Sequence, residues 1–347
     1  MAGMLMPRKG VVLKAIIEQF IRTGTPVASL DVTRLYHLGV SPATVRNEVA
    51  WLKKEGFLLQ PHTSAGSVPS DKGYRYYVNS LLDVEEISAE EQRRLRHMFH
   101  QVEMELEEWM GLAACLLAQL VNNVALVVPP RTARARLRRL HLVSVHSKVA
   151  LLVLVLQDGR LRRQLLTFED EITQDQLDTI CNRLNAIYGG LTRARLKTEP
   201  AELSPQEARV LQVAAVLMAT EDEREYEEPR LEGLRRLLGQ PEFVHSDKAL
   251  DIMDVLETRA LVRGMMAQVR GGDVSVVIGE ENPNEALRDL SLVVSRYGVP
   301  GEFTGAIGVV GPRRMPYSRS ISSVRFLAAL LGELAAELYS GSYRGTQ

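Results

Sequence analysis

Hydrophobic residues in the first part of the chain recur every three to four positions, which is the period of a helix with one buried face. Residues 11–23 show this period, and Gly24, followed two positions later by a proline, ends the segment. A second, shorter helical segment begins at Ser29, and a tight turn is expected at Gly39. The pattern therefore predicts two helices followed by a turn.

The third helix has a strong start signal. Ser41 is a favourable N-cap residue, and Pro42 occupies the first helical position, where its missing N–H costs no hydrogen bond. Val45, Val49 and Leu52 follow at helical spacing and form the predicted buried stripe. We expect this helix to end before the next glycine in the chain.

A short strand and a polar loop follow the third helix. The strand is expected over 57–59, and the loop HTSAGSVPS begins at His62. Helix, short helix, tight turn, capped helix, strand and polar loop occur in this order in winged helix-turn-helix domains. The pattern predicts such a DNA-binding domain over residues 1–80.

The remainder of the chain predicts a mixture of helices and strands. Strand-like runs at 140–145 and 149–156 precede an acidic helical block, and further strand patterns and a final helix follow that block. We therefore expect an α+β multidomain protein, in which an α/β domain carries a helical insertion. The expected parts are a connecting helix over 81–110, the α/β domain over 111–169 and 240–347, and the insertion over 170–239.

Composition narrows the class of protein. The chain has 347 residues, of which 46% are apolar and 24% charged, and this excludes a largely disordered or fibrous chain. The two cysteines, Cys115 and Cys181, exclude a disulfide scaffold and fit a reducing cytoplasm. The longest unbroken apolar run, over 149–156, is too short for the ~20 residues of a membrane helix, so no membrane partner is expected.

Charge is distributed unevenly along the chain. The net charge is −1, but residues 1–80 hold ten Lys and Arg against five Asp and Glu, which gives +5 and leaves −6 for the other 267 residues. A small basic unit joined to an acidic remainder favours a module that binds a polyanion. The alternative is a solvated surface that happens to be basic.

The first turns of the third helix carry the candidate base-reading residues. Ser41, Thr44 and Asn47 stand three positions apart, and Arg46 lies beside them. An asparagine side chain can form two hydrogen bonds with an adenine edge, and an arginine two with a guanine. The alternative is that the serine is only a helix cap and the arginine only part of a solvated face.

Two further groups are candidates for contacts with phosphates, which position a protein on DNA without reading its sequence. They are Lys53 and Lys54 in the third helix, and His62, Thr63, Ser64, Gly66 and Ser67 in the loop. The alternative for the loop is an ordinary hairpin tip. Because no second His or Cys lies at ligand spacing from His62, no metal site is expected.

No pattern in the sequence predicts an enzyme or a cofactor. We find no Ser/His/Asp, Cys/His or metal-ligand set. The segment GAIGVVGP, over 305–312, has glycines at a spacing that fits neither a dinucleotide loop nor a phosphate-binding loop. A closely packed, buried strand is expected there instead.

Several segments of the chain resemble the heat-inducible transcription repressor HrcA family. The N-terminal ones are SPATVRNE, QPHTSAG and KGYRYYV, in the order and spacing of that family. The later ones are LRRLLGQPEF (234–243), VVIGEEN (276–282), DLSLVVSRYG (289–298) and GAIGVVGPRRMPYSR (305–319). The resemblance covers most of the chain.

The resemblance implies a fold and a function. It implies an N-terminal winged helix, a GAF-like domain and a dimerisation domain inserted in the latter. It also implies a dimeric repressor that binds an inverted-repeat operator, the CIRCE element, ahead of chaperone operons and is relieved on heat stress, with the chaperonin GroEL favouring the active form. By motif match, Ser41, Thr44, Arg46 and Asn47 fall on the recognition helix and 62–67 on the wing, where this chain departs from the family by having Ser67 in place of an arginine.

One alternative function stays open from the sequence. A GAF-like domain can hold a small molecule, so the chain is alternatively a ligand-sensing transcription regulator. A pocket with converging polar groups would favour that alternative.

Overall fold

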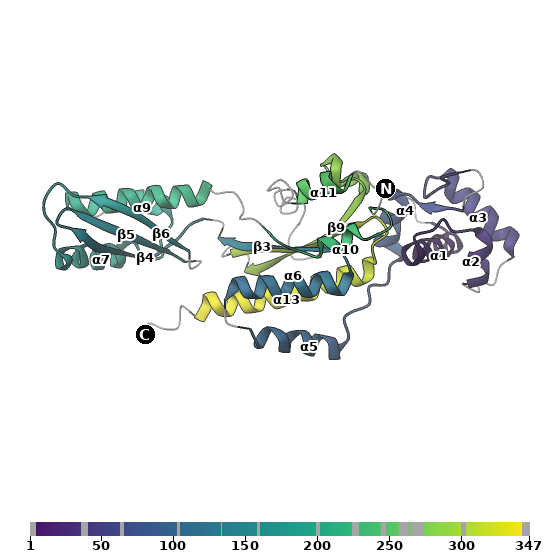
Figure 1. Cartoon of the computed structure of the whole chain (residues 1–347), viewed down its shortest axis with the longest axis horizontal. Helices are drawn as coiled ribbons and strands as arrows, with labels where there is room; N and C mark the ends of the chain where they lie inside the picture. Colours follow the sequence, from purple (N-terminus) through teal and green to yellow (C-terminus); the bar gives the residue numbers. More distant parts are fainter. Residues whose placement is uncertain are drawn as a thin grey trace. The chain divides into compact units, whose positions relative to one another are not determined.

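The computed structural model contains both helices and sheets, which confirms the α+β class (Figure 1). It describes residues 5–35, 41–62, 66–102, 105–132, 134–157, 160–198, 202–223, 229–243, 248–256, 264, 274–299 and 303–341. Two compact units are formed. The first comprises Met1–Pro129, Glu227–Tyr297 and Ala306–Leu331, and the second comprises Pro130–Tyr226, Gly298–Gly305 and Gly332–Gln347.

The first unit begins with helices that pack around one small core. These are α1 (Pro7–Thr23), α2 (Ser29–Leu35) and α3 (Pro42–Lys54), followed by the hairpin of β1 (Leu58–Leu59) and β2 (Val68–Pro69), then α4 (Asp71–Tyr76) and the π-helix η1 (Tyr77–Leu81). Val12, Ile16 and Leu52 are among the fully buried side chains that join α1 to α3. The helices expected from Ser29 and from Pro42 are therefore confirmed.

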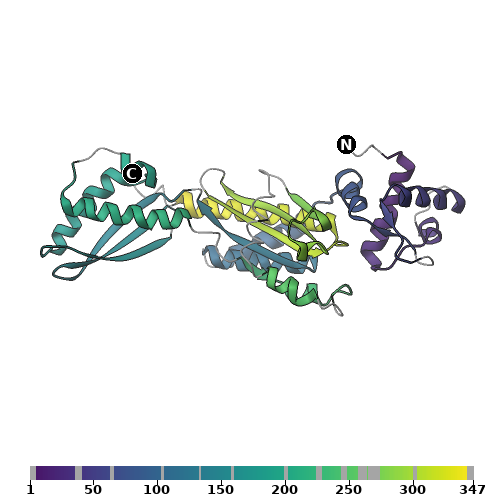
Figure 2. The same cartoon turned by 90° about the horizontal axis from the view of Figure 1, so that it is seen from above.

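A larger sheet forms the centre of the first unit. Its strands in spatial order are β7 (Arg230–Glu232), β3 (Val124–Thr132), β10 (Phe303–Pro312), β9 (Leu290–Val299) and β8 (Ser275–Ile278). The apolar helices α6 (Leu106–Val121) and α13 (Tyr317–Gly341) cover one face of it (Figure 1, Figure 2). The short elements around it are α10 (Leu234–Leu238), α11 (Lys248–Leu256), η2 (Gly279–Glu281) and η3 (Glu285–Leu287).

The buried strand expected over 305–312 is confirmed by β10, which is buried along nearly its whole length. Close packing explains its glycines. A Cβ at Gly311 would lie 2.5 Å from Oδ1 of Asn123, closer than a carbon and an oxygen can approach without a shift of the neighbour. The glycine is therefore structural.

The connecting helix expected over 81–110 is not continuous in the structure. Residues 82–88 form neither helix nor strand, α5 spans Ala89–His100, and α6 begins only at Leu106. The Ser88 hydroxyl caps α5 by accepting a hydrogen bond from the Glu91 N–H at 3.3 Å. A local capping interaction therefore starts a new helix where the charge pattern alone predicts a continuing one.

The second unit is built on a smaller sheet of order β4-β5-β6, formed by Leu137–His146, Val149–Leu156 and Leu161–Thr167. One face is covered by α7 (Gln174–Tyr188), α8 (Arg193–Thr198) and α9 (Pro205–Glu223). Burial alternates along β5, so that Ala150, Leu152 and Leu154 enter this core. The three strands and the helices therefore share one hydrophobic core, and they do not belong to two separate domains.

The described helices include none that is both long and apolar enough to cross a bilayer.

Candidate nucleic-acid interface

The start of α3 has the capped geometry that its sequence predicts. The Ser41 hydroxyl accepts a hydrogen bond from the Thr44 N–H at 3.2 Å and lies 2.9 Å from the Thr44 hydroxyl. Pro42 occupies the first turn, where no hydrogen-bond donor is needed. The cap orders the helix N-terminus, whose free N–H groups and dipole favour a phosphate.

Burial divides α3 into two faces. Val45, Val49 and Leu52 are at most 4% exposed and face the core, while Arg46 and Asn47 are exposed to solvent. Within the described residues, neither of these two polar side chains makes a hydrogen bond or an ion pair. Long and short donors on a free helix face are what base reading in the major groove requires.

Contacts from α1 fix the rotation of α3 about its axis. The Lys9 ammonium lies 3.2 Å from a carboxylate oxygen of Glu48 and 4.7 Å from the centre of the Trp51 ring. Because Glu48 is held by Lys9, it does not neutralise Arg46 on the neighbouring face. The contacts therefore keep the Arg46 side of the helix positive and open.

The sequence pattern did not identify one feature of this face. Ala50 is also exposed, and together with Ala43, Asn47 and Lys54 it continues one stripe along α3. Small apolar side chains beside polar ones allow close approach to a base edge and contact with a thymine methyl. The helical spacing of Ala50 from Ala43 and Asn47 is the sequence signal that could have identified it.

The two lysines of α3 differ in their surroundings. Lys53 donates a hydrogen bond to the Gln60 side chain at 2.9 Å, which joins α3 to the hairpin. Lys54 is exposed to solvent. Of the two, Lys54 is the one whose ammonium group stays free of protein partners among the described residues and can meet a phosphate.

The hairpin loop brings only part of its predicted residues to the surface. His62 is exposed, whereas Ser67 is 2% exposed and its N–H and C=O both bond with the backbone of Val27, at 2.8 and 2.9 Å. Gly66 packs so closely that a Cβ there would lie 2.6 Å from the Val27 carbonyl carbon. Thr63 and Ser64 lie outside the described residues.

Replacing Ser41 with alanine is expected to lower the free energy of unfolding by about 0.5–2 kcal/mol, because the cap of α3 is lost. Urea unfolding followed by circular dichroism measures this change. A matched Ser29→Ala variant should have a smaller effect, because no capping hydrogen bond of the Ser29 side chain is found in the described structure. Equal stability of Ser41→Ala and the wild type would contradict a capping role.

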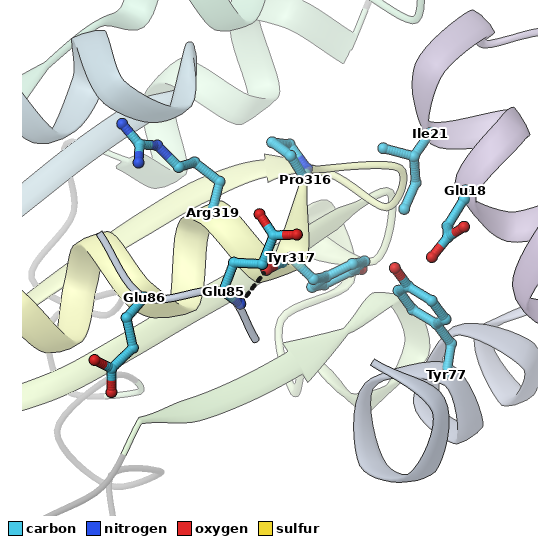
Figure 3. A pocket seen from close by; sticks show the side chains of 9 residues that line it. Glu18, Ile21, Tyr77, Glu85, Glu86, Pro316, Tyr317 and Arg319 are labelled. Carbon is cyan, nitrogen blue, oxygen red and sulfur yellow. Dashed lines mark hydrogen bonds between the residues drawn. The ribbon is translucent and has the colours of Figure 1, made fainter. Parts of the chain in front are cut away.

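A cavity of about 270 Å³ lies in the first unit, away from the exposed face of α3. Figure 3 shows Glu18, Tyr77 and Tyr317 directed toward the same space. Burial raises the pKa of the Glu18 carboxyl, and the nearby Lys14 opposes that rise. The cavity is slightly smaller than the range of about 300–1,000 Å³ typical of ligand pockets.

Comparison with known proteins identifies the chain's relatives. Residues 107–321 match the family model described as the HrcA protein C-terminal domain. Proteins named heat-inducible transcription repressor HrcA are similar over almost the whole chain. One from Dehalococcoides mccartyi is 43% identical over 340 residues, and one from Herpetosiphon aurantiacus is 40% identical over 343 residues; the alignments cover 97% and 96% of both partners.

A solved structure shares the fold. The crystal structure of a hypothetical protein is 22% identical, superposes with a TM-score of 0.60, and is matched over 96% of this chain and 98% of that chain. The family relatives, rather than this structure, carry the functional name, and they confirm the resemblance found in the sequence motifs. The chain belongs to the HrcA family of heat-inducible transcription repressors.

Proposed function

We propose that the chain represses chaperone operons in the cytoplasm as a homodimer bound to an inverted-repeat operator of the CIRCE type. In this proposal α1 to α3 and the β1–β2 hairpin act as a winged helix, and α3 is the recognition helix. Heat relieves repression. No catalytic step, metal or cofactor is part of the proposal.

The face of α3 described above is the observation that carries the proposal. A capped helix buries Val45, Val49 and Leu52 and leaves Arg46 and Asn47 without protein partners among the described residues. A solvated surface would explain exposure alone, but the exposed alanines beside these donors favour close approach to a base edge. Ser41, Thr44, Arg46, Asn47 and Lys54 form the proposed contact set on α3.

The wing contributes less to the proposed interface. His62 is the described loop side chain best exposed for a phosphate, whereas the buried Ser67 supports the hairpin through its backbone. Thr63, Ser64 and Gly66 remain proposed phosphate contacts through their backbone N–H groups, and Lys53 acts through its bond to the hairpin.

The open face of the β4-β5-β6 sheet supports dimerisation. Val143, Leu151 and Leu165 form one cross-strand row on it, and Val143 and Leu165 are 50% and 57% exposed. Leu161 adds apolar surface two rows further along the sheet, beyond the row formed by His141, Val153 and Arg163. An open apolar sheet face of this kind marks an interaction site, and in a repressor of a two-fold operator the occupant is a second copy of the chain.

The hydrophobic cores of the two units support the proposed domain organisation. We propose a DNA-binding domain over 1–80, a GAF-like domain built on the larger sheet, and an inserted dimerisation domain. The strands of β4 to β6 share a core with α7 and α9, which favours an insertion over about 130–226 rather than the 170–239 expected from helical pattern alone.

A nuclease footprint tests the proposed function. Protection of both arms of the inverted repeat is expected, with the half-site centres separated by about 34 Å or a multiple of it, because a two-fold dimer presents two recognition helices. Addition of GroEL, the partner implied by the family, is expected to extend protection to lower repressor concentrations. Protection of a single arm, or equal protection of unrelated sequence, would contradict the proposal.

The cavity of Figure 3 favours a second candidate function, ligand sensing, although its walls come partly from α1 and η1 and not from the α/β domain alone, in which the sequence places a ligand. A ligand there would contact α1, η1 and the start of α13 together. A metabolite screen by thermal shift tests it. A rise in melting temperature that is lost in Tyr77→Ala would favour this function, and no rise with any metabolite would count against it.

A further inference from the structure

Three of the segments that resemble the HrcA family lie outside the proposed DNA contacts and meet at one place in the first unit. They are KGYRYYV, VVIGEEN and GAIGVVGPRRMPYSR. Arg75 of α4 donates from Nε to Glu281 Oε1 at 2.7 Å and from Nη2 to the second oxygen of the same carboxylate. The same Nη2 donates to the Val276 carbonyl of β8 at 2.7 Å. A two-pronged arginine–carboxylate pair fixes direction as well as distance.

A second set of contacts is made one turn earlier on α4, by the Asp71 carboxylate. Asp71 accepts hydrogen bonds from the Glu280 N–H at 2.9 Å and from Nη1 of Arg313 at 3.2 Å. A Cβ added to Gly279 would lie 2.1 Å from an Asp71 carboxylate oxygen, so the approach of the two segments requires a glycine there. We call Asp71, Arg75, Glu281 and Arg313 the charged clasp.

Other contacts join the N-terminal helices to the rest of the first unit at separate points. The rings of Tyr74 and Tyr317 lie 5.9 Å apart beneath the clasp, and both side chains are 1% exposed. Arg314 pairs with Glu242 and donates to the Ile21 carbonyl at the end of α1. Attachment at several separated points opposes rotation as well as separation.

We propose that the charged clasp positions the recognition helix by fixing the direction of α3 relative to the larger sheet. This inference rests on the proposed function. A dimer whose recognition helices are held to their larger sheets reaches a narrower range of half-site separations than a dimer with loosely attached helices, which loses more conformational entropy when it binds both half-sites. The clasp residues are therefore positioning residues that select operator spacing without touching DNA.

The test uses full-length protein and three DNA probes. These are the inverted repeat, the same repeat with its spacer lengthened by about 5 base pairs, half a helical turn, and an isolated half-site. The variants are Arg75→Glu, Glu281→Arg and the exchanged pair carrying both changes. Arg93→Glu, an exposed residue of α5, is the matched charge control.

The wild type and the control are expected to prefer the normal spacer. Each single clasp variant should reduce that preference by about tenfold while its half-site affinity stays within about twofold of the wild type. The exchanged pair should recover only part of the preference, because it restores the ion pair but not the bond from residue 75 to the Val276 carbonyl. Unchanged preference in both single variants would overturn the clasp's role, as would equal loss on the half-site. If the wild type does not distinguish the inverted repeat from scrambled DNA, the proposed function itself fails.

Discussion

Replacing Asn47 with alanine is expected to weaken operator binding by about 5- to 150-fold, which corresponds to ~1–3 kcal/mol, and to leave binding to random DNA almost unchanged. Asn47 is exposed on α3, and no described residue bonds its amide. Its two hydrogen-bonding groups are therefore free for a base edge. Fluorescence anisotropy with labelled operator and random duplexes measures both affinities.

Lys54→Ala is the matched control for this prediction, because Lys54 lies on the same exposed side of α3. A lysine that meets phosphates contributes equally to all sequences, so its loss should weaken both duplexes alike and reduce the salt dependence by about one counterion. Equal losses on operator and random DNA for Asn47→Ala would argue against direct base reading by that residue.

Replacing Leu165 with lysine is expected to convert the proposed dimer to a monomer and to weaken operator binding by about 100- to 10,000-fold. Leu165 lies on the open face of the smaller sheet and is 57% exposed, so the substitution spares the core of its own unit. In a two-fold interface over this face, each copy would bury one lysine charge without a partner. Sedimentation velocity and operator titration measure the two effects.

Val216→Lys provides the matched control for the interface. Val216 lies on α9 in the same unit and is 59% exposed, so it introduces the same charge at an equally accessible apolar position outside the open sheet face. This variant should sediment as a dimer and bind like the wild type. A dimeric Leu165→Lys protein with normal affinity would place the dimer contact elsewhere on the molecule.

Local signals in the sequence were sufficient for the core of the candidate site. The Ser41 cap, Pro42 and the stripe that contains Val45 lie within a few residues of one another, so their interactions depend on neighbours along the chain. The structure confirms the cap and the buried stripe. The exposure of Arg46 follows from the same helical period.

Contacts between distant segments were not predictable in this way. Ser67 is polar and lies in a Gly/Ser loop, yet its pairing with Val27 buries it. The strand β7 lies inside the segment 170–239 that the helical pattern predicts to be a helical insertion, and there Leu231 pairs with Leu126 of β3. Such pairings depend on tertiary neighbours rather than on local propensity. The charged clasp likewise joins residues more than 200 positions apart.

A gel shift of the wild-type protein on an inverted repeat of the CIRCE type, beside a scrambled duplex of equal length and composition, tests the central claim most directly. The inverted repeat should be retained at repressor concentrations that leave the scrambled duplex free, and the affinity should fall steeply from 50 to about 200 mM salt. Equal retardation of both duplexes across that range would contradict sequence-specific recognition by α3.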